Sequence, residues 1–237
     1  MRATCVIVMP VYNEQDCIGR VCQEWLSVVE SLPGARLLVV DDGCTDRTPE
    51  ILEELARRHP AMTVLHQSNT GHGGAVLHGY RTALQMGCEW VCQVDGDGQL
   101  QARDFARLQE AAARFRYVLG YRAGRRDPVH RRWLSAGLRL LIAIVFGVRI
   151  RDPNAPFRLM EARYLAELLP LVPENAFAPN VFLSILARRR GQDFCEVPVS
   201  HLERRAGRGS LSGVRLLRAV VRCLKDLIAF RLVRNAT

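Results

Sequence analysis

Short apolar runs alternate with amphipathic segments along the first half of the chain. In the segment Asp16 to Val29 the apolar side chains recur at helical spacing and share one face. The apolar runs are short and bounded by polar residues, which favours strands. Strands are therefore predicted at Cys5 to Met9, Leu37 to Val40, Thr63 to His66, Glu89 to Val94 and Tyr117 to Gly120. Helices are predicted at Asp16 to Val29, Glu50 to Arg58, Gly74 to Met86 and about Ala102 to Phe115.

Regular alternation of strands and helices is typical of an α/β protein with a mostly parallel, Rossmann-like central sheet flanked by helices. The second half is less regular. There we predict helices at Arg131 to Val148, Glu161 to Leu169 and Val181 to Arg190, a strand at Phe194 to Val199, and loops at Asp152 to Arg158 and Arg204 to Ser210. No repeat and no low-complexity linker interrupts residues 1–210, so we expect them to form one domain. Residues 211–237 are expected to form an amphipathic C-terminal helix, from Leu211 to Val233.

Four polar clusters each come directly after a predicted strand. They are Pro10 to Glu14, Asp41 to Gly43, Ser68 to Gly71, and Asp95 to Asp97. Parallel sheets bind ligands beyond the carboxyl ends of their strands. We therefore expect the four clusters to meet at one edge of the sheet.

The cluster Asp95-Gly96-Asp97-Gly98-Gln99 suggests a metal site. Two carboxylates one residue apart can both reach one hard cation, and Mg²⁺ or Mn²⁺ prefers oxygen ligands. Gln99 adds a carbonyl oxygen to this set. An acidic turn without a ligand remains the alternative for these residues taken alone. An EF-hand is excluded, because the later oxygen ligands of that loop are absent.

Two further clusters suggest a nucleotide site. Asp46 is expected to cap the following helix, whereas a strand end needs no carboxylate pair such as Asp41 and Asp42. Such a carboxylate accepts hydrogen bonds from a base or a ribose, although a solvated turn remains open for Asp41. The glycine-rich segment Asn69 to Ala75 opens a helix, where backbone N–H groups bind phosphate. A tight turn without a ligand is the alternative for this segment.

The chain is basic, with a formal net charge of +9 and a pI near 9.6. This charge indicates an anionic partner. Nucleic acid is disfavoured, because the acidic clusters would repel its backbone and no basic motif interleaved with aromatic residues occurs. The eight cysteines are interpreted as reduced residues of a cytosolic protein, and the Cys88 and Cys92 spacing indicates zinc only weakly.

No apolar stretch reaches the length of about 20 residues that a membrane-spanning helix needs, and the first residues lack the features of a signal peptide. We therefore expect a soluble or peripheral protein. The predicted C-terminal helix places Arg215, Arg218, Arg222 and Lys225 in one arc, with an apolar face beside it. Such a helix suits an anionic membrane surface, a membrane-protein partner or packing on its own domain.

Taken in order and spacing, these motifs resemble the family 2 inverting glycosyltransferases of the GT-A fold. The subgroup they resemble most is the dolichol-phosphate mannose synthase-like, polyprenyl-phosphate glycosyltransferases. The segments that carry the resemblance are Pro10 to Glu14, Val39 to Thr48, Asn69 to Ala75, Asp95 to Gln99, Gly120 to Arg122, Arg131 to Ser135, Asp152 to Leu159 and Arg205 to Ser210.

The resemblance implies a role for each half of the domain. Residues 1–120 would bind a nucleotide-sugar, and residues 121–210 would bind the acceptor. The donor site would include Pro10, Tyr12, Glu14, Asp41, Asp42, Asn69, Gly73 and Asp95. Asp95, Asp97 and Gln99 would hold Mg²⁺ or Mn²⁺. The acceptor phosphate would meet Arg122, Arg131, Arg205 and Ser210.

Two departures from the subgroup pattern fall on the acceptor side. Ala155-Pro156 stands where a glycine is expected before Phe157, and the final loop reads Gly-Arg-Gly-Ser-Leu, at residues 207–211, in place of Gly-x-Ser-Lys. Two acceptors therefore stay open. A lipid phosphate brings its own nucleophile, and Arg122 would hold it, whereas a sugar hydroxyl would need a base, for which Asp152 is the candidate. Asp97, Arg122 and Asp152 are thus the predicted catalytic residues.

Three functions follow in order of preference. The first is metal-dependent, inverting transfer of a sugar from a nucleotide-sugar to a polyprenyl phosphate, at the cytoplasmic face of a membrane. The second is transfer to a glycan or small-molecule hydroxyl. The third is a non-catalytic nucleotide-binding protein, although the metal carboxylates favour an enzyme.

Overall fold

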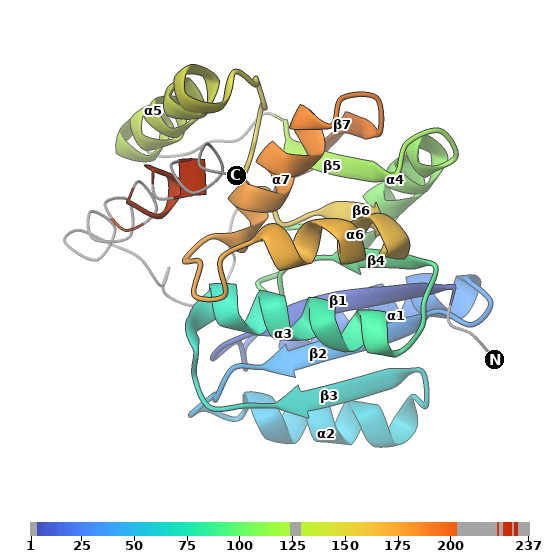
Figure 1. Cartoon of the computed structure of the whole chain (residues 1–237). Helices are drawn as coiled ribbons and strands as arrows, with labels where there is room; N and C mark the ends of the chain where they lie inside the picture. Colours follow the sequence, from blue (N-terminus) through green and yellow to red (C-terminus); the bar gives the residue numbers. More distant parts are fainter. Residues whose placement is uncertain (1–3, 124–128, 203–221, 223–224, 229, 232–237) are drawn as a thin grey trace.

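The computed structural model describes residues 4–123, 129–202, 222, 225–228 and 230–231. Within these residues, seven strands form one sheet in the order β3-β2-β1-β4-β6-β5-β7 (Figure 1). The strands are β1 (Cys5–Val11), β2 (Arg36–Asp41), β3 (Met62–His66), β4 (Trp90–Gln93), β5 (Tyr117–Arg122), β6 (Arg158–Glu161) and β7 (Phe194–Val199). The helices are α1 (Ile18–Ser31), α2 (Thr48–Arg58), α3 (Gly71–Gln85), α4 (Phe105–Ala112), α5 (Val129–Phe146), α6 (Ala162–Leu168) and α7 (Pro179–Arg189), with 3₁₀ turns η1 (Ala102–Asp104) and η2 (Leu169–Leu171).

The sheet is parallel except at β6, which runs antiparallel to both of its neighbours. Each predicted strand is present. The central strands β1, β2 and β4, and the first part of β5, supply mostly apolar runs that both faces of the sheet bury, whereas the edge strands β3 and β7 are largely half-buried. The carboxyl ends of β1, β2, β4 and β5 consequently lie along one edge of the sheet. The predicted α/β class with a mostly parallel central sheet is therefore confirmed.

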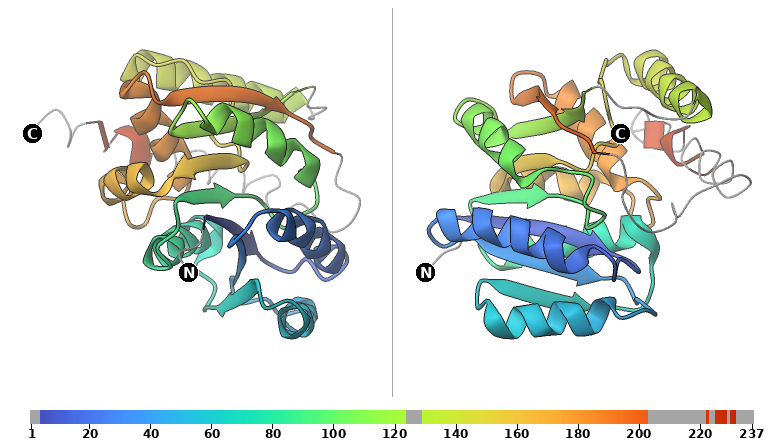
Figure 2. Two further views of the ribbon diagram at one scale, coloured as in Figure 1. Left: turned by 90° about the vertical axis from the view of Figure 1, so that its right-hand side faces the viewer. Right: turned by 180° about the vertical axis from the view of Figure 1, so that it is seen from behind.

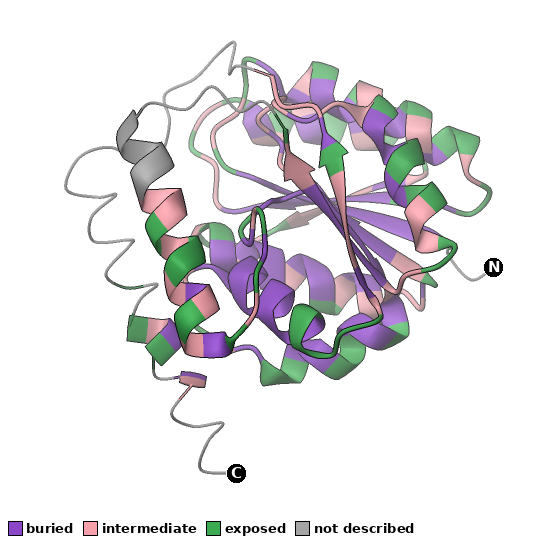
Figure 3. Ribbon diagram, turned by 90° about the horizontal axis from the view of Figure 1, so that it is seen from above, coloured by how far each residue is buried: buried purple, intermediate pink, exposed green. Residues whose placement is uncertain are grey.

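Helices cover both faces of the sheet. One apolar core forms where α3, α5, α6 and α7 pack on the sheet, and a second where α1, α2 and α4 pack on the opposite face. Figure 2 shows the second face from behind, with α1 and α4 across the strands. In Figure 3 the strands and the inner helix faces are buried, while the outer helix faces are exposed. The two cores fix the sheet between them and so fix the edge where the polar loops emerge.

Several boundaries differ from the sequence prediction. The segment Asp152 to Arg158 was predicted as a loop, but Arg158 begins β6, which continues directly into α6. The prediction was wrong there because β6 has only four residues and gains its stability from pairing with β4 and β5. Asp46 is not the N-cap of α2, which is Arg47, yet its carboxylate still accepts a hydrogen bond from the backbone N–H of Thr48 at 3.0 Å.

Part of the predicted C-terminal helix is described, and its described residues are helical. Leu227 is fully buried, and the Phe230 ring lies 5.0 Å from the Phe182 ring and 6.1 Å from the Phe146 ring, between centroids. At these positions the apolar face packs on the protein's own domain, although Ile228 remains half exposed. The rest of residues 211–237, including Arg215 and Arg218, lies outside the described residues. None of the described helices combines the length and the hydropathy needed to span a bilayer.

Candidate functional site

The loop after β1 is bonded to the loop after β2. The Asn13 side chain accepts the backbone N–H of Thr45 at 2.8 Å and donates to the Thr45 hydroxyl at 3.2 Å. Asn13 takes a left-handed φ of 54°, which asparagine tolerates better than most residues. The backbone N–H of Glu14 donates to the Thr48 hydroxyl at 2.9 Å. These bonds hold Tyr12 and Glu14 beside the Asp41 to Asp46 segment, and the Tyr12 side chain is 46% exposed.

Asp42 joins the loop after β2 to the loop after β3. Its side chain is almost fully buried, and its Oδ1 accepts hydrogen bonds from the Thr70 backbone N–H at 2.8 Å and the Gln67 amide at 2.7 Å. Asp41 accepts the backbone N–H of Cys44 at 2.9 Å and contacts the His66 imidazole at 2.8 Å. The expectation that this strand end needs no carboxylate pair was wrong. Both carboxylates satisfy N–H groups of the loops that follow, which the strand ladder leaves without partners.

The loop after β4, Asp95 to Gln99, which is the predicted metal loop, meets the other three loops at the same edge. The Cys17 thiol donates to the Gly96 carbonyl at 3.6 Å, which brings the loop after β1 against the loop after β4. His72 Nε2, at the start of α3, lies 3.8 Å from Asp95 Oδ1. A Cβ on Gly96 would lie only 2.8 Å from Val11, so glycine permits this approach. The predicted convergence of the four clusters is therefore confirmed.

Asp95 is oriented by the last residue of β4, and Asp97 by its own loop. Gln93 Nε2 donates to Asp95 Oδ1 at 3.2 Å, and the Gln99 backbone N–H donates to Asp97 Oδ1 at 3.1 Å. The Gln99 side-chain amide donates to the Leu202 carbonyl at 3.0 Å, so its carbonyl oxygen remains the end suited to a cation. The Asp95 side chain is 28% exposed and accessible to a ligand.

The oxygen atoms of Asp95, Asp97 and Gln99 are ligands of the kind that Mg²⁺ or Mn²⁺ prefers. Among the described residues, no group of three His, Cys, Asp or Glu side chains is placed to enclose a metal. Magnesium, however, is commonly bound through one or two carboxylates, with water and substrate phosphates completing the shell. The pair Asp95 and Asp97, supplemented by Gln99, matches that open arrangement, whereas a fully protein-lined site such as structural zinc does not.

Gly73 has a structural reason to be glycine. A Cβ at this position would lie 2.5 Å from the Ala176 carbonyl oxygen and 2.8 Å from that of Phe177. The first turn of α3 is thus pressed against the segment before α7. Pro10 is buried within β1, while Asn69 is exposed and its side chain accepts the backbone N–H of Gly71 at 3.2 Å. Of the predicted donor residues, Tyr12, Glu14, Asn69 and Asp95 are therefore accessible, and Pro10, Asp41, Asp42 and Gly73 are covered by protein.

Arg122, at the end of β5, forms a bidentate ion pair with Asp152. Arg122 Nε and Nη2 donate to the two Asp152 oxygens at 2.7 and 2.9 Å. Their side chains are 13% and 17% exposed, so the pair is partly shielded from water. Such bidentate, charge-assisted bonds are among the strongest polar contacts in proteins. The two predicted catalytic residues on the acceptor side thus contact each other. The Arg131 side chain, Arg205 and Ser210 lie outside the described residues.

A basic cleft of about 1040 Å³ opens beside this pair. It lies between the end of β5, α5 and the segment before Asp152, and Ser135 and Leu140 of α5 line it. Its charged lining consists of Arg122, Arg139, Arg149, Arg151, Arg188, Asp152 and Glu196. Arg151 donates to the Tyr121 hydroxyl at 2.7 Å and stacks over that ring. Burial raises the pKa of Glu196, and the nearby arginines only partly oppose this. The excess of arginine suits an anion.

The sequence prediction missed four of these arginines. Arg139, Arg149 and Arg188 come from three separate segments, and only the fold brings them together with Arg122 and Arg151. The run Arg149-Ile150-Arg151-Asp152 was the one local signal, because it places two cations directly before the predicted acceptor loop.

Residues 6–169 match the family model described as glycosyl transferase family 2. The chain belongs to this family. The undecaprenyl-phosphate 4-deoxy-4-formamido-L-arabinose transferase of Pseudomonas paraeruginosa is 31% identical over 215 residues, which cover 89% of this chain and 61% of that relative. This chain therefore spans less than two thirds of that relative's length. The undecaprenyl-phosphate mannosyltransferase of Micrococcus luteus is 28% identical over 231 residues, which cover 94% of both chains.

Solved structures show the same fold. The glucosyl-3-phosphoglycerate synthase of Mycobacterium tuberculosis, in complex with UDP, superposes with a TM-score of 0.72 and 19% identity, over 97% of this chain and 80% of that one. Another structure of that synthase, with Mn²⁺, UDP and glucosyl-3-phosphoglycerate, has a TM-score of 0.71 and 18% identity, over 96% and 80% of the two chains. The expected GT-A fold of this family 2 glycosyltransferase is thereby confirmed.

The Asp41–His66–Glu53 contact predicts a pH dependence of stability. His66 Nδ1 contacts Asp41 and Nε2 contacts Glu53, both at 2.8 Å. Hydrogen bonds to Glu53 and then to Asp41 raise the pKa of His66 above its ordinary value of 6.5. Burial alone would raise the pKa of Asp41, but hydrogen bonds from Cys44 and His66 outweigh it and lower that pKa below 3.8.

Because the pKa of His66 is higher in the folded than in the unfolded chain, protonated His66 stabilises the fold. The full contribution is present below pH 6.5 and is lost as the pH rises through the pKa of the folded state. As the pH rises above 6.5, the melting temperature of the wild type should therefore fall further than that of His66→Gln. The extra fall should be about 2 °C, because a half-exposed ion pair contributes less than about 1 kcal/mol. Thermal melts of both proteins across this pH range measure the difference. Parallel pH profiles would contradict the assignment.

Proposed function

We propose that this chain transfers a sugar from a nucleotide-sugar to a polyprenyl phosphate, in a metal-dependent reaction that inverts the anomeric carbon. The observation that carries the proposal is the pairing of two sites along one sheet edge. The Asp95 and Asp97 loop lies at the end of β4, and the arginine-rich cleft begins at the end of β5. The names of the bacterial relatives, which join undecaprenyl phosphate to sugar transfer, support the same reaction.

On the donor side, Asp95, Asp97 and Gln99 would hold Mg²⁺ or Mn²⁺ against the diphosphate. When bound, the cation would offset the negative charge that develops on the departing nucleoside diphosphate. Tyr12 and Glu14 are accessible beside Asp41 and Asp42, so they would contact the nucleoside, with Asn69 at the start of α3. Asp42 would act mainly by fixing these loops, because the protein already supplies its hydrogen bonds.

On the acceptor side, a lipid phosphate is a monoester with a second pKa of about 6 and is mostly a dianion at neutral pH. It is already a nucleophile, so no general base is required. It must instead be held near a negatively charged donor, and arginine serves that purpose through paired N–H donors. Arg122 and the cleft arginines would supply them, together with Arg131, Arg205 and Ser210. Asp152 is bound by Arg122, which favours this account over Asp152 acting as base for a hydroxyl acceptor.

The contact with the membrane would be made by α5. Leu140 and Ile144 are 63% and 74% exposed and stand one helical turn apart, and Leu140 also lines the basic cleft. Apolar side chains next to arginines suit a peripheral position on an anionic, cytoplasmic membrane face. Of the described residues of the C-terminal segment, Leu227 and Phe230 would not contribute to this surface, because they pack inward.

A binding screen tests the donor half of the proposal. UDP- and GDP-sugars should each be added with Mn²⁺ or with excess chelator, and the melting temperature recorded. We expect at least one nucleotide-sugar to stabilise the protein by several degrees in the presence of metal only. If no nucleotide-sugar stabilises it, or if the chelator changes nothing, the proposal of a metal-bound donor fails.

A further inference from the structure

Arg158 is a fully buried arginine at the start of β6. No carboxylate among the described residues forms an ion pair with it. Its guanidinium instead donates to the Tyr117 hydroxyl at 2.6 Å, to the Asn180 carbonyl at 3.0 Å and to the Ala155 carbonyl. A buried cation held only by neutral oxygens is unfavourable unless the surrounding network is specific. This cation therefore calls for an explanation beyond packing.

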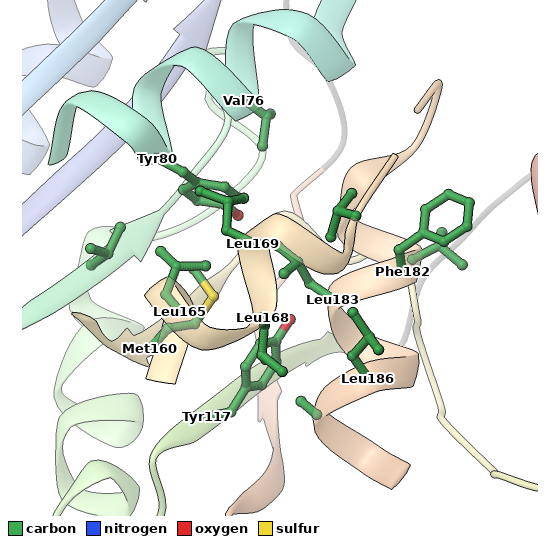
Figure 4. Packing of buried hydrophobic residues seen from close by; sticks show 14 of the residues in the cluster. Val76, Tyr80, Tyr117, Met160, Leu165, Leu168, Leu169, Phe182, Leu183 and Leu186 are labelled. Atoms are coloured by element: carbon green, nitrogen blue, oxygen red, sulfur yellow. The ribbon is translucent and has the colours of Figure 1, made fainter. Parts of the chain in front are cut away.

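Asn180, on the first turn of α7, links Arg158 to β4. Its carbonyl accepts from Arg158, and its side-chain Nδ2 donates to Gln93 Oε1 at 2.8 Å. The Tyr80 hydroxyl lies 3.0 Å from both Gln93 Oε1 and Asn180 Oδ1. Figure 4 shows Tyr80 and Tyr117 within the apolar cluster that encloses this network. Burial raises the pKa of Tyr80, on which the charges of Arg158 and Asp95 act in opposite directions.

In this hydrogen-bond network, Gln93 is the residue that contacts the predicted metal loop. It is fully buried, and its Nε2 donates to Asp95 Oδ1 at 3.2 Å. The Asn180 amide donates to Gln93 Oε1, and the single hydroxyl proton of Tyr80 lies within reach of both Gln93 Oε1 and Asn180 Oδ1. If the Gln93 amide turned over, its NH₂ group would face the Asn180 NH₂ group and its carbonyl would face the Asp95 carboxylate. Asn180 thus fixes the orientation of the Gln93 amide, and Gln93 in turn fixes that of the Asp95 carboxylate.

The same network reaches the acceptor side. The Ser184 hydroxyl donates to the Pro153 carbonyl at 2.9 Å, and Arg158 holds the Ala155 carbonyl. These two contacts fix the loop that follows Asp152. The loop is anchored one helical turn along α7 from Asn180, which supports Gln93.

We propose that Gln93 and Asn180 are positioning residues that hold the Asp95 carboxylate ready for the cation, and that Arg158 anchors them to the acceptor loop. The proposal rests on the proposed function, because it assigns Asp95 to the metal. Partners that orient a metal-binding group typically change metal affinity or activity by about 10- to 100-fold when they are removed.

Direct measurement of Mn²⁺ binding tests this role. Free Mn²⁺ would be titrated by electron paramagnetic resonance in the presence of UDP or GDP, for the wild type and for Gln93→Met, which keeps the side chain's length but removes both hydrogen-bonding groups. We expect Gln93→Met to bind Mn²⁺ about 10-fold more weakly. Tyr80→Phe, which removes only one donor to Gln93 and keeps the ring, should weaken binding less and serves as the test if Gln93→Met does not fold.

Ser184→Ala is the matched control. The Ser184 hydroxyl contacts Arg158 and the carbonyls of Pro153 and Asn180, so alanine leaves both hydrogen-bond donors to Gln93 in place. It should lower the melting temperature and leave Mn²⁺ affinity unchanged. The inference is overturned if Gln93→Met binds Mn²⁺ as tightly as the wild type, or if Tyr80→Phe does so where it replaces an unfolded Gln93→Met. It is also overturned if Ser184→Ala weakens Mn²⁺ binding as much as the test variant does. If the wild type itself does not bind Mn²⁺, the metal site of the proposed function fails as well, which separates the two failures.

Discussion

Asp97→Ala is expected to lower the rate of sugar transfer by about 10³-fold, while the protein stays folded. The reason is electrostatic. A metal ion contributes several kcal/mol to stabilising a leaving group's charge, and about 4 kcal/mol corresponds to this factor. Asp97 also accepts the backbone N–H of Gln99, so alanine removes a turn contact as well as a ligand. Initial rates with Mn²⁺, compared with the wild type, measure the effect.

Asp97→Asn separates the two losses. Asparagine retains an oxygen for the Gln99 N–H but carries no charge, so it should preserve the melting temperature and still lose most of the activity. Glu54→Gln provides a control for the change of charge, because Glu54 is exposed on α2, where it pairs with Arg58. Wild-type transfer rates in Asp97→Ala would contradict the metal assignment.

Arg122→Gln is expected to lower kcat/KM for the acceptor by about 10²-fold, without changing the affinity for the donor. Truncating one partner of a shielded, hydrogen-bonded charge pair typically costs 2 kcal/mol or more, about 30-fold upwards. Steady-state kinetics with the acceptor varied measure this value. Arg122→Lys should recover only part of it, because lysine keeps the charge but not the paired donors.

The ion pair makes Asp152→Asn the decisive comparison. If Asp152 only orients Arg122, as the bonds of 2.7 and 2.9 Å indicate, its loss should be smaller than that of Arg122→Gln and should not change the pH profile. If Asp152 were a general base, Asp152→Asn would lower kcat most and abolish the acidic limb of that profile, where the base becomes protonated. Arg58→Gln on the distant helix α2 controls for loss of one positive charge, since its side chain is 69% exposed.

The sequence predicted the donor half of the fold well because its signals are local. Apolar runs form the buried strands, and only Gly96 separates Asp95 from Asp97 in the chain. The acceptor half depends on long-range contacts. Strand β6 is held by pairing with β4 and β5. Arg158, expected at the end of a loop, is buried because β5, α7 and the preceding loop supply its hydrogen-bond partners. The basic cleft likewise joins arginines from segments that are distant in sequence.

The aspartate pair after β2 shows a different limit. The sequence correctly indicated a polar edge, but it could not show that Asp41 and Asp42 would be used mainly by the protein. Asp41 binds Cys44 and His66, and Asp42 binds Gln67 and Thr70. A carboxylate at a strand end can accept hydrogen bonds either from a ligand or from the N–H groups of the next loop, and the residue type is the same in both cases. Only the positions of the donors distinguish the two uses.

The central claim is transfer of a sugar to a lipid phosphate, and one assay tests it most directly. The protein would be incubated with Mn²⁺, a polyprenyl phosphate in vesicles and the radiolabelled nucleotide-sugar that stabilises it, and the organic phase would then be extracted. We expect label in a lipid-linked product that requires Mn²⁺ and does not form with the unphosphorylated polyprenol. Label that enters only water-soluble glycans, or a lipid product that forms equally from the polyprenol, would contradict it.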